Sequence, residues 1–255
     1  MIKIIRHSLI LTFFTVAIHG YSYPEEGRDT IFQTSIITAL LEGIYDGDVT
    51  YRDLRKHGDF GLGTFNGLDG EMIEMEGKFY QIKADGVAYP VDDSMKTPFA
   101  VVTFFEPDKD VLLDKAMDCK QLEQYIGNLL PTKNIFYAIK IEGLFKYIKA
   151  RSVPKQNKPY PRLIEVVKNQ PTFEFHDVKG TMAGFWFPDY MKEINVSSYH
   201  FHFITDDKKA GGHLLECQLQ NVRIEIDYTS ELHISLPERS DFYKTKLEKE
   251  KETKK

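Results

Sequence analysis

The sequence has few cysteines and no excess of positive charge. Only Cys119 and Cys217 occur in 255 residues, which is too few for a disulfide framework, and although the two could pair outside the cytoplasm we expect free core thiols. The net charge of -5 provides no basic field for nucleic acid. A P-loop, a dinucleotide-binding glycine fingerprint and a Gly-x-Ser-x-Gly elbow are also absent, which argues against the enzyme classes that use them.

The N-terminus has the order of a secretory signal peptide. Basic residues occur in positions 1–7, an apolar run covers positions 8–18, and small residues follow. The run of eleven residues is shorter than the roughly 20 that span a bilayer, so we expect cleavage between Gly20 and Ser22 and no stable membrane anchor. With residues 1–22 removed, the protein is predicted to be exported, to a periplasm or to the cell exterior.

Hydrophobic spacing predicts few helices and many strands. Helical spacing covers residues 35–44, Thr50 begins a short helix, and Asp118 caps a longer one. The glycine-rich residues 59–71 predict a loop or a bulged strand. Strands are expected at residues 72–75, 78–82, 98–105, 135–141, 144–148, 172–175, 180–187, 199–204, 213–222 and 233–236.

Four prolines between residues 154 and 171 indicate a domain boundary. We therefore predict an N-terminal α/β domain with a mixed sheet over residues 28–160, and a mainly β domain over residues 161–243. A charge-dense tail with almost nothing to bury covers residues 244–255.

Three histidines form the main candidate site. Residues 199–203 read Tyr-His-Phe-His-Phe, so in a strand His200 and His202 share one face and the aromatic side chains the other. Residues 206–212 predict a hairpin loop, which returns His213 to a cross-strand position. Three imidazoles without a cysteine are typical of a catalytic zinc with an open position, although Fe, Co, Ni and Cu also accept imidazole.

Two charged residues could act beside such a metal. Glu71 closes the turn of residues 68–71, where flanking glycines let a ligand approach the backbone. Arg151 ends a predicted strand just before the proline-rich segment, and its guanidinium could hold a carboxylate bidentately. Taken singly, each is more often a surface charge.

Several strings of the sequence resemble the alpha-acetolactate decarboxylase family. They are Gly-Asp-Phe-Gly-Leu-Gly-Thr-Phe at 58–65, Leu-Asp-Gly-Glu at 68–71, Thr-Pro-Phe-Ala at 97–100, Arg-Ser-Val-Pro-Lys-Gln at 151–156, Pro-Tyr-Pro at 159–161 and the block 200–213. The likeness runs from about Ile31 to Phe242. It implies an α/β fold of the α+β type, with two domains, mixed and antiparallel β-sheets and few helices, and a homodimer.

The same resemblance implies a function and a set of site residues. The expected reaction is the zinc-dependent decarboxylation of 2-acetolactate (2-hydroxy-2-methyl-3-oxobutanoate) to acetoin and CO2, in acetoin biosynthesis, through a metal-stabilised enediolate. The matching residues are His200, His202 and His213 as Zn2+ ligands, Glu71 and Arg151 as catalytic residues, and Thr64 with Arg151 as substrate-binding residues. The proton would come from Glu71, and Arg151 would orient the substrate carboxylate.

The family also places a glutamate from its C-terminal tail in the site. Glu248, Glu250 and Glu252 are candidates for it that the sequence does not rank. Two other functions stay open. One is a cupin-like metal oxygenase with Asp206 as the carboxylate ligand, and the other is a non-catalytic secreted metal-binding protein.

Overall fold

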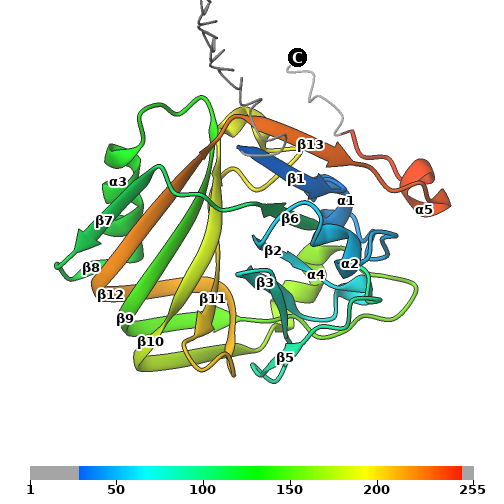
Figure 1. Ribbon diagram of the computed structural model, residues 1–255. Helices are drawn as coiled ribbons and strands as arrows, with labels where there is room; N and C mark the ends of the chain where they lie inside the picture. The colour runs from blue at the N-terminus through cyan, green and yellow to red at the C-terminus, as the bar shows by residue number, and fades with distance from the viewer. Residues whose placement is uncertain (1–28, 249–255) are drawn as a thin grey trace, which may run out of the picture.

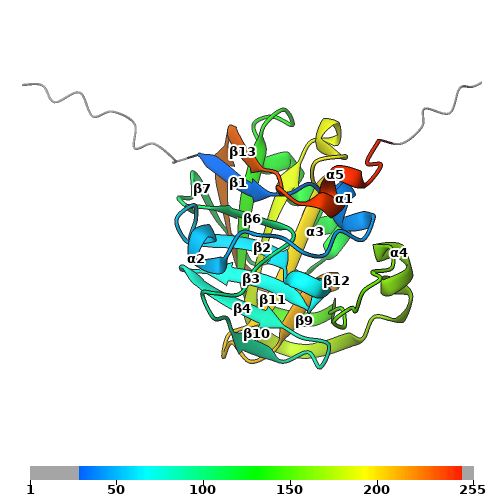
Figure 2. The same ribbon diagram turned by 90° about the vertical axis from the view of Figure 1, so that its right-hand side faces the viewer.

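In the computed structural model, which describes residues 29–248, two β-sheets face each other across a shared apolar core (Figure 1). The core takes Ile31, Phe60 and Ile73 from one sheet, and Phe185 and Ile204 from the other. In Figure 2 the strands of the first sheet run across those of the second, which lie behind them. This arrangement lets two sheets bury one face each.

The first sheet has seven strands, and its order is not the order of the chain. The order is β13 (Glu231–Ser235), β1 (Thr30–Thr34), β6 (Ala100–Thr103), β2 (Phe60–Thr64), β3 (Glu71–Met75), β4 (Lys78–Ile82) and β5 (Ala88–Pro90). Strands β1 and β13 are parallel, and the other neighbours are antiparallel. The sheet is therefore mixed.

The second sheet is antiparallel and contains very long strands. They are β7 (Lys109–Leu113), β8 (Met117–Asp118), β9 (Phe136–Arg151), β10 (Thr172–Phe187), β11 (Ser198–Thr205) and β12 (Gly211–Thr229). The main order is β11-β10-β9-β12-β7, and β11 also pairs with the start of β12. Strands β9, β10, β11 and β12 thus form a closed ring at one end of the sheet, because each pairs with two of the others.

Helices are few and short. They are α1 (Ile37–Leu41), α2 (Tyr51–Leu54), α3 (Cys119–Leu129), α4 (Leu163–Val166) and α5 (Ser240–Lys244), with 3-10 turns η1 (Asn66–Leu68), η2 (Val167–Asn169) and η3 (Asp189–Met191). Helix α3 packs Leu122 and Ile126 on the side of the second sheet that faces away from the first sheet (Figure 1). None of the helices described is both long and apolar enough to cross a membrane.

These features confirm the predicted fold class, and both predicted helix caps are present. The Asp118 side chain accepts from the Gln121 amide, and the Thr50 hydroxyl accepts from the Asp53 amide. The glycine-rich segment was expected to be a loop or a bulged strand, but β2 is a regular, buried strand. Gly61 permits it, since a Cβ there would lie 2.4 Å from the Val101 carbonyl oxygen of β6.

The prediction of two free thiols is wrong. Cys119 and Cys217 form a disulfide, with their Cα atoms 5.1 Å apart. Strand β8 pairs with β12 through Asp118 and Gln218, and this pairing brings the neighbouring cysteines together. The bond ties the first residue of α3 to the second sheet.

Neither sheet is built from one continuous stretch of the chain. Strands β7 to β9 precede residue 160 but pair with strands that follow it, and β13 returns to the first sheet. The division at residue 160 stays a prediction. The predicted leader, residues 1–22, lies outside the described residues.

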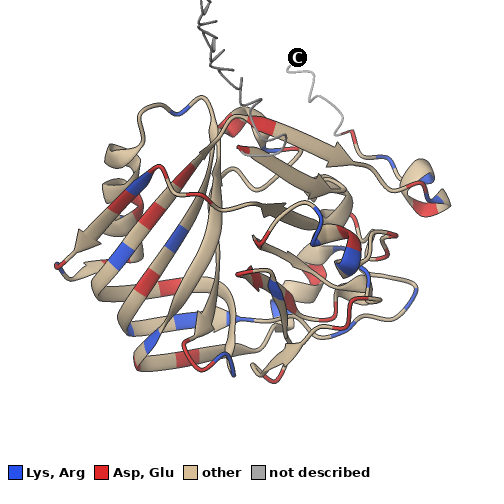
Figure 3. Ribbon diagram, in the orientation of Figure 1, with Lys and Arg blue, Asp and Glu red and all other residues tan. Residues whose placement is uncertain are grey.

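Acidic and basic residues are interspersed along the long strands of the second sheet (Figure 3). The ammonium of Lys140 lies 2.7 Å from the Glu225 carboxylate, and that of Lys149 lies 3.0 Å from the Glu216 carboxylate. These cross-strand pairs neutralise one another, so this face has no field of a single sign.

Candidate active site

The three predicted histidines converge at the closed end of the second sheet. His202 of β11 is the direct cross-strand partner of His213 of β12, and His200 precedes it on the same face of β11. His213 Nδ1 lies 3.2 Å from His200 Nε2 and 3.3 Å from His202 Nε2. All three candidate ligand atoms lie within 4.8 Å of one another. The sequence therefore predicted both the shared face and the cross-strand return.

The protonation of these rings suits a metal site. His202 Nδ1 donates to the Met72 carbonyl oxygen at 2.7 Å, which leaves the lone pair of Nε2 facing the other rings. Burial lowers the pKa of His200 to about 3, and it lowers the pKa of His202 and His213 well below the usual value. Neutral imidazoles whose nitrogens meet at one point fit a divalent transition metal.

Glu71 and Arg151 lie beside the histidines as a buried ion pair. Arg151 Nη1 donates to Glu71 Oε1, and the two side chains are only 13% and 7% exposed. The second carboxylate oxygen, Oε2, lies 3.4 Å from His202 Nε2. Burial raises the pKa of Glu71, and the positive charge of Arg151 opposes this shift. Considered singly from the sequence, each of the two residues was more often a surface charge. In the structure they form a buried pair that is part of the site.

Local backbone geometry places these groups. Arg151 ends β9 directly opposite His213 of β12, so the arginine and the ligands share one row across the ring. Glu71 begins β3 after Gly70, whose φ of 90° suits glycine and whose added Cβ would lie 2.3 Å from the Ile82 carbonyl oxygen. Thr64 pairs with Glu71 across β2 and β3, and its hydroxyl donates to the Gly70 carbonyl at 2.6 Å.

A cavity of about 270 Å3 opens above these groups. The predicted residues Thr64, Glu71, Arg151 and the three histidines line it. Its other walls are mainly apolar and come from Ile37, Leu40, Leu41, Leu68, Phe99, Leu163 and Val196. The arrangement can hold a small polar molecule against the metal ligands while apolar side chains surround the rest of it.

Sequence reasoning missed part of this cavity. Helix α1 was predicted from its apolar spacing, but nothing in that spacing connects it with the histidines. The loop of residues 192–197 also lines the cavity, and its position just before β11 was the only signal available. The sequence could not indicate the hydrogen bond from His202 to the Met72 carbonyl oxygen, because every residue has a backbone carbonyl and its identity does not mark this one.

The remaining predicted candidates are Asp206 and the three tail glutamates, and they lie elsewhere or outside the described chain. Asp206 is exposed in the turn after β11 and does not belong to the group of metal-binding side chains. Glu248 is exposed at the end of the described residues, whereas Glu250 and Glu252 lie outside them. The structure therefore does not choose between the tail glutamates.

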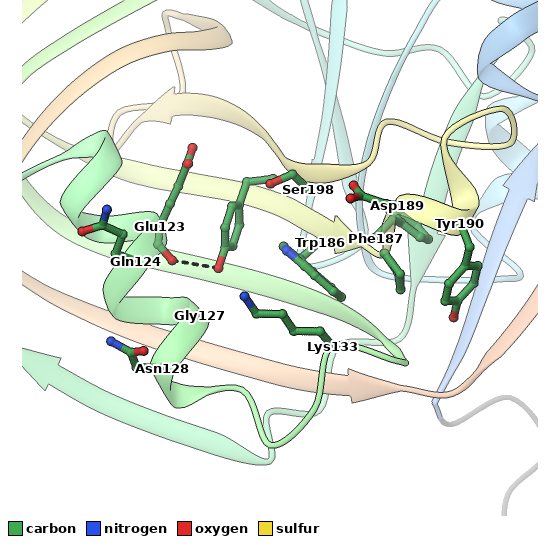
Figure 4. A pocket seen from close by; sticks show the side chains of 12 residues that line it. Glu123, Gln124, Gly127, Asn128, Lys133, Trp186, Phe187, Asp189, Tyr190 and Ser198 are labelled. Atoms are coloured by element: carbon green, nitrogen blue, oxygen red, sulfur yellow. Dashed lines mark hydrogen bonds between the residues drawn. The ribbon is translucent and has the colours of Figure 1, made fainter. Parts of the chain in front are cut away.

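A second, more open cavity of about 800 Å3 lies on the opposite side of β11 (Figure 4). Helix α3 forms one side, with Glu123 and Gln124, and the end of β10 forms the other, with Trp186. Tyr199 faces this groove and donates to the Glu123 carbonyl at 2.9 Å. The side chains of β11 therefore alternate between the two cavities, as the strand pattern predicts.

Comparison with known proteins gives a consistent result. The family model described as "Alpha-acetolactate decarboxylase" matches residues 31–249. An alpha-acetolactate decarboxylase of Methylococcus capsulatus is 50% identical over 212 residues, which are 83% of this chain and 82% of that protein. The corresponding protein of Bacillus subtilis strain 168 is 43% identical over 218 residues, 86% of each chain.

Solved structures show the same likeness. The crystal structure of the Bacillus subtilis strain 168 decarboxylase matches with a TM-score of 0.85 over 86% of this chain and 94% of that chain, at 43% identity. A Staphylococcus aureus protein, described as of unknown function and similar to alpha-acetolactate decarboxylase, matches with a TM-score of 0.83 at 30% identity over 86% of this chain and 94% of that chain.

Proposed function

Because the chain belongs to the alpha-acetolactate decarboxylase family, we propose that it is a zinc-dependent acetolactate decarboxylase, a carboxy-lyase that converts 2-acetolactate to acetoin and CO2. One observation carries the proposal. Three neutral imidazoles meet at one point beside the buried Glu71–Arg151 pair, at the base of a small cavity.

His200, His202 and His213 would hold the metal. Zn2+ suits three neutral imidazoles with a position left for substrate. When bound, it supplies a Lewis acid that withdraws electron density from the keto and hydroxyl oxygens of 2-acetolactate. The hydrogen bond from His202 to the Met72 carbonyl would hold one ligand ring in the required tautomer.

Arg151 orients the leaving carboxylate. Its Nη1 is bonded to Glu71, and the other N–H groups of the guanidinium remain for a carboxylate at the cavity base. The bond between C1 and C2 of the substrate breaks, CO2 leaves, and the electron pair moves toward the oxygen on C3. A fixed orientation of the carboxylate keeps the breaking bond aligned with the keto group.

Glu71 delivers the proton that completes the reaction. After CO2 has left, C2 of the enediolate needs one proton to become acetoin, and the Glu71 carboxyl lies beside the ligand His202. Burial favours the protonated form of Glu71 that this step uses, and Arg151 holds the carboxyl in place by its hydrogen bond. The carboxylate left after the transfer is neutralised by Arg151 and takes up one proton from solvent before the next turnover. Delivery from one fixed group within a mainly apolar cavity would also determine the configuration of the product.

The test is CO2 and acetoin release from racemic 2-acetolactate by the purified protein. We expect turnover that chelation abolishes and that Zn2+ restores in proportion to measured zinc content. Turnover that survives near-complete loss of zinc would reject the metal-dependent mechanism. Oxygen uptake with bound iron would instead favour the oxygenase alternative, for which exposed Asp206 offers no support.

Export of the protein forms a second part of the proposal. The disulfide between Cys119 and Cys217 supports it, because such bonds persist in oxidising compartments, and so does the composition of the leader. We also propose a homodimer, as the family resemblance implies. Cell fractionation with N-terminal sequencing tests export, and light scattering on the purified protein tests the homodimer.

A further inference from the structure

The metal cavity has one charged side chain to which the mechanism assigns no role. Its three histidines are neutral, and its charged residues are Glu71, Arg151 and Lys192. Glu71 and Arg151 neutralise each other in their ion pair. Lys192 is exposed, and it has no ion-pair partner within residues 29–248. The cavity therefore has one uncompensated cation, on its solvent-facing side.

The loop that carries Lys192 is attached firmly to the first sheet. Gln33 Nε2 of β1 donates to the Ile194 carbonyl at 2.8 Å, and the Ile37 amide donates to the same carbonyl at 2.9 Å. Asn195 Nδ2 donates to Gln33 Oε1 at 2.7 Å, and both of these side chains are buried. The segment two and three residues after Lys192 is thus held against β1 and the start of α1, which keeps Lys192 beside the cavity that it lines.

The charge of the whole chain makes this position significant. The net charge is -5, so the average field repels an anion such as 2-acetolactate. We propose that Lys192 attracts the carboxylate of the substrate to the cavity mouth and so favours anionic substrates over uncharged ones. The inference rests on the proposed decarboxylase function, to which it adds a residue that governs substrate selection.

Such a role predicts a defined kinetic pattern. Attraction at the mouth acts on the encounter with the substrate, so removing it should change KM and kcat/KM but leave kcat unchanged. Because Lys192 is an exposed residue, loss of its charge should lower kcat/KM by only about 2- to 5-fold at low salt. The difference should vanish at about 1 M salt, where the screening length is about 3 Å.

The experiment compares Lys192→Met, Lys192→Glu and Lys192→Arg with the wild-type protein. Lys133→Met is the matched control, because Lys133 lines the groove of Figure 4 and does not line the metal cavity. We expect kcat/KM at low salt to fall with Met, to fall further with Glu, and to recover with Arg. Equal values for wild-type and Lys192→Glu would overturn the proposal, as would a change confined to kcat.

A binding measurement separates this inference from the proposed function. Calorimetry on the zinc-loaded protein would compare 2-hydroxy-2-methylpropanoate with its uncharged amide. Lys192→Met should weaken binding of the carboxylate about 2- to 5-fold and leave binding of the amide unchanged. Equal effects on both ligands would overturn the role of Lys192. If Lys192→Met weakens binding of the carboxylate alone while the wild-type protein releases no CO2, the role of Lys192 stands and the decarboxylase function alone is refuted.

Discussion

Breaking the Cys119–Cys217 disulfide should destabilise the fold by several kcal/mol and leave the metal cavity intact. The bond joins residues 98 positions apart, from the start of α3 to the middle of β12. Neither cysteine lines the metal cavity. The reduced protein should therefore keep its kcat at temperatures well below the unfolding midpoint.

The magnitude follows from chain entropy. Closing a loop of about 100 residues in the unfolded chain raises the free energy of unfolding by about 4.7 kcal/mol at 25 °C. The 220 described residues, 29–248, have an unfolding entropy of about 0.46 kcal/mol/K at about 2.1 cal/mol/K each. Dividing the free energy of the cross-link by this unfolding entropy gives a fall in Tm of about 10 °C when the bond is broken.

The assay is thermal unfolding of oxidised wild-type protein, of wild-type protein with reductant, and of the Cys119→Ala/Cys217→Ala variant. The reduced wild type is the matched control, since it loses the cross-link but keeps both sulfur atoms in place. The double variant should unfold at a lower temperature still, because Cys217 is buried and alanine leaves a cavity there. Equal Tm values with and without reductant, or two titratable thiols in the unreduced protein, would refute the reasoning.

Three further predictions concern ionisable groups. Glu71→Gln should lower kcat about 10²- to 10⁴-fold at unchanged zinc content, since an amide cannot deliver the proton; full turnover in a CO2-release assay would disprove that role. Arg151→Lys should lower kcat/KM about 10- to 100-fold because the fork of donors is lost, and an unchanged value would rule out bidentate recognition. Burial raises the pKa of Asp227 from 3.8 to about 7, so between these pH values the folded state holds a proton that the unfolded state has lost. The free energy of unfolding should therefore fall as pH rises from about 4 to about 7, by up to about 4 kcal/mol. Asp227→Asn should remove this slope in urea titrations across that range, and a slope that persists would show that another group causes it.

The parts of the site that local pattern could predict are those on neighbouring strands. Alternation placed His200 and His202 on one face, and the polar segment of residues 206–212 predicted the hairpin that brings back His213. Both follow from the two-residue period of a strand and from turn composition. The order of neighbouring residues alone is therefore enough to predict which histidines share a face and where the chain turns back.

The missing parts depend on contacts between distant segments. The disulfide forms because the two-residue strand β8 pairs with β12, and no periodicity marks so short a strand. Glu71 and Arg151 are 80 residues apart, and only the packing of β3 against the second sheet makes them partners. Family resemblance identified these two residues, but it did not supply their ion pair or the cavity wall from α1 and residues 192–197.

The closed ring of β9 to β12 limits how the length of this chain can change. Arg151, His213 and His202 occupy one row across three paired strands. Inserting or deleting a single residue within β11, between His200 and His202, would turn one of these two ligands toward the groove on the far side. Residues 207 and 208, at the tip of the turn, carry no ligand and make no backbone hydrogen bond to a strand outside this hairpin in the described structure, so we expect natural length variation near the site to collect there.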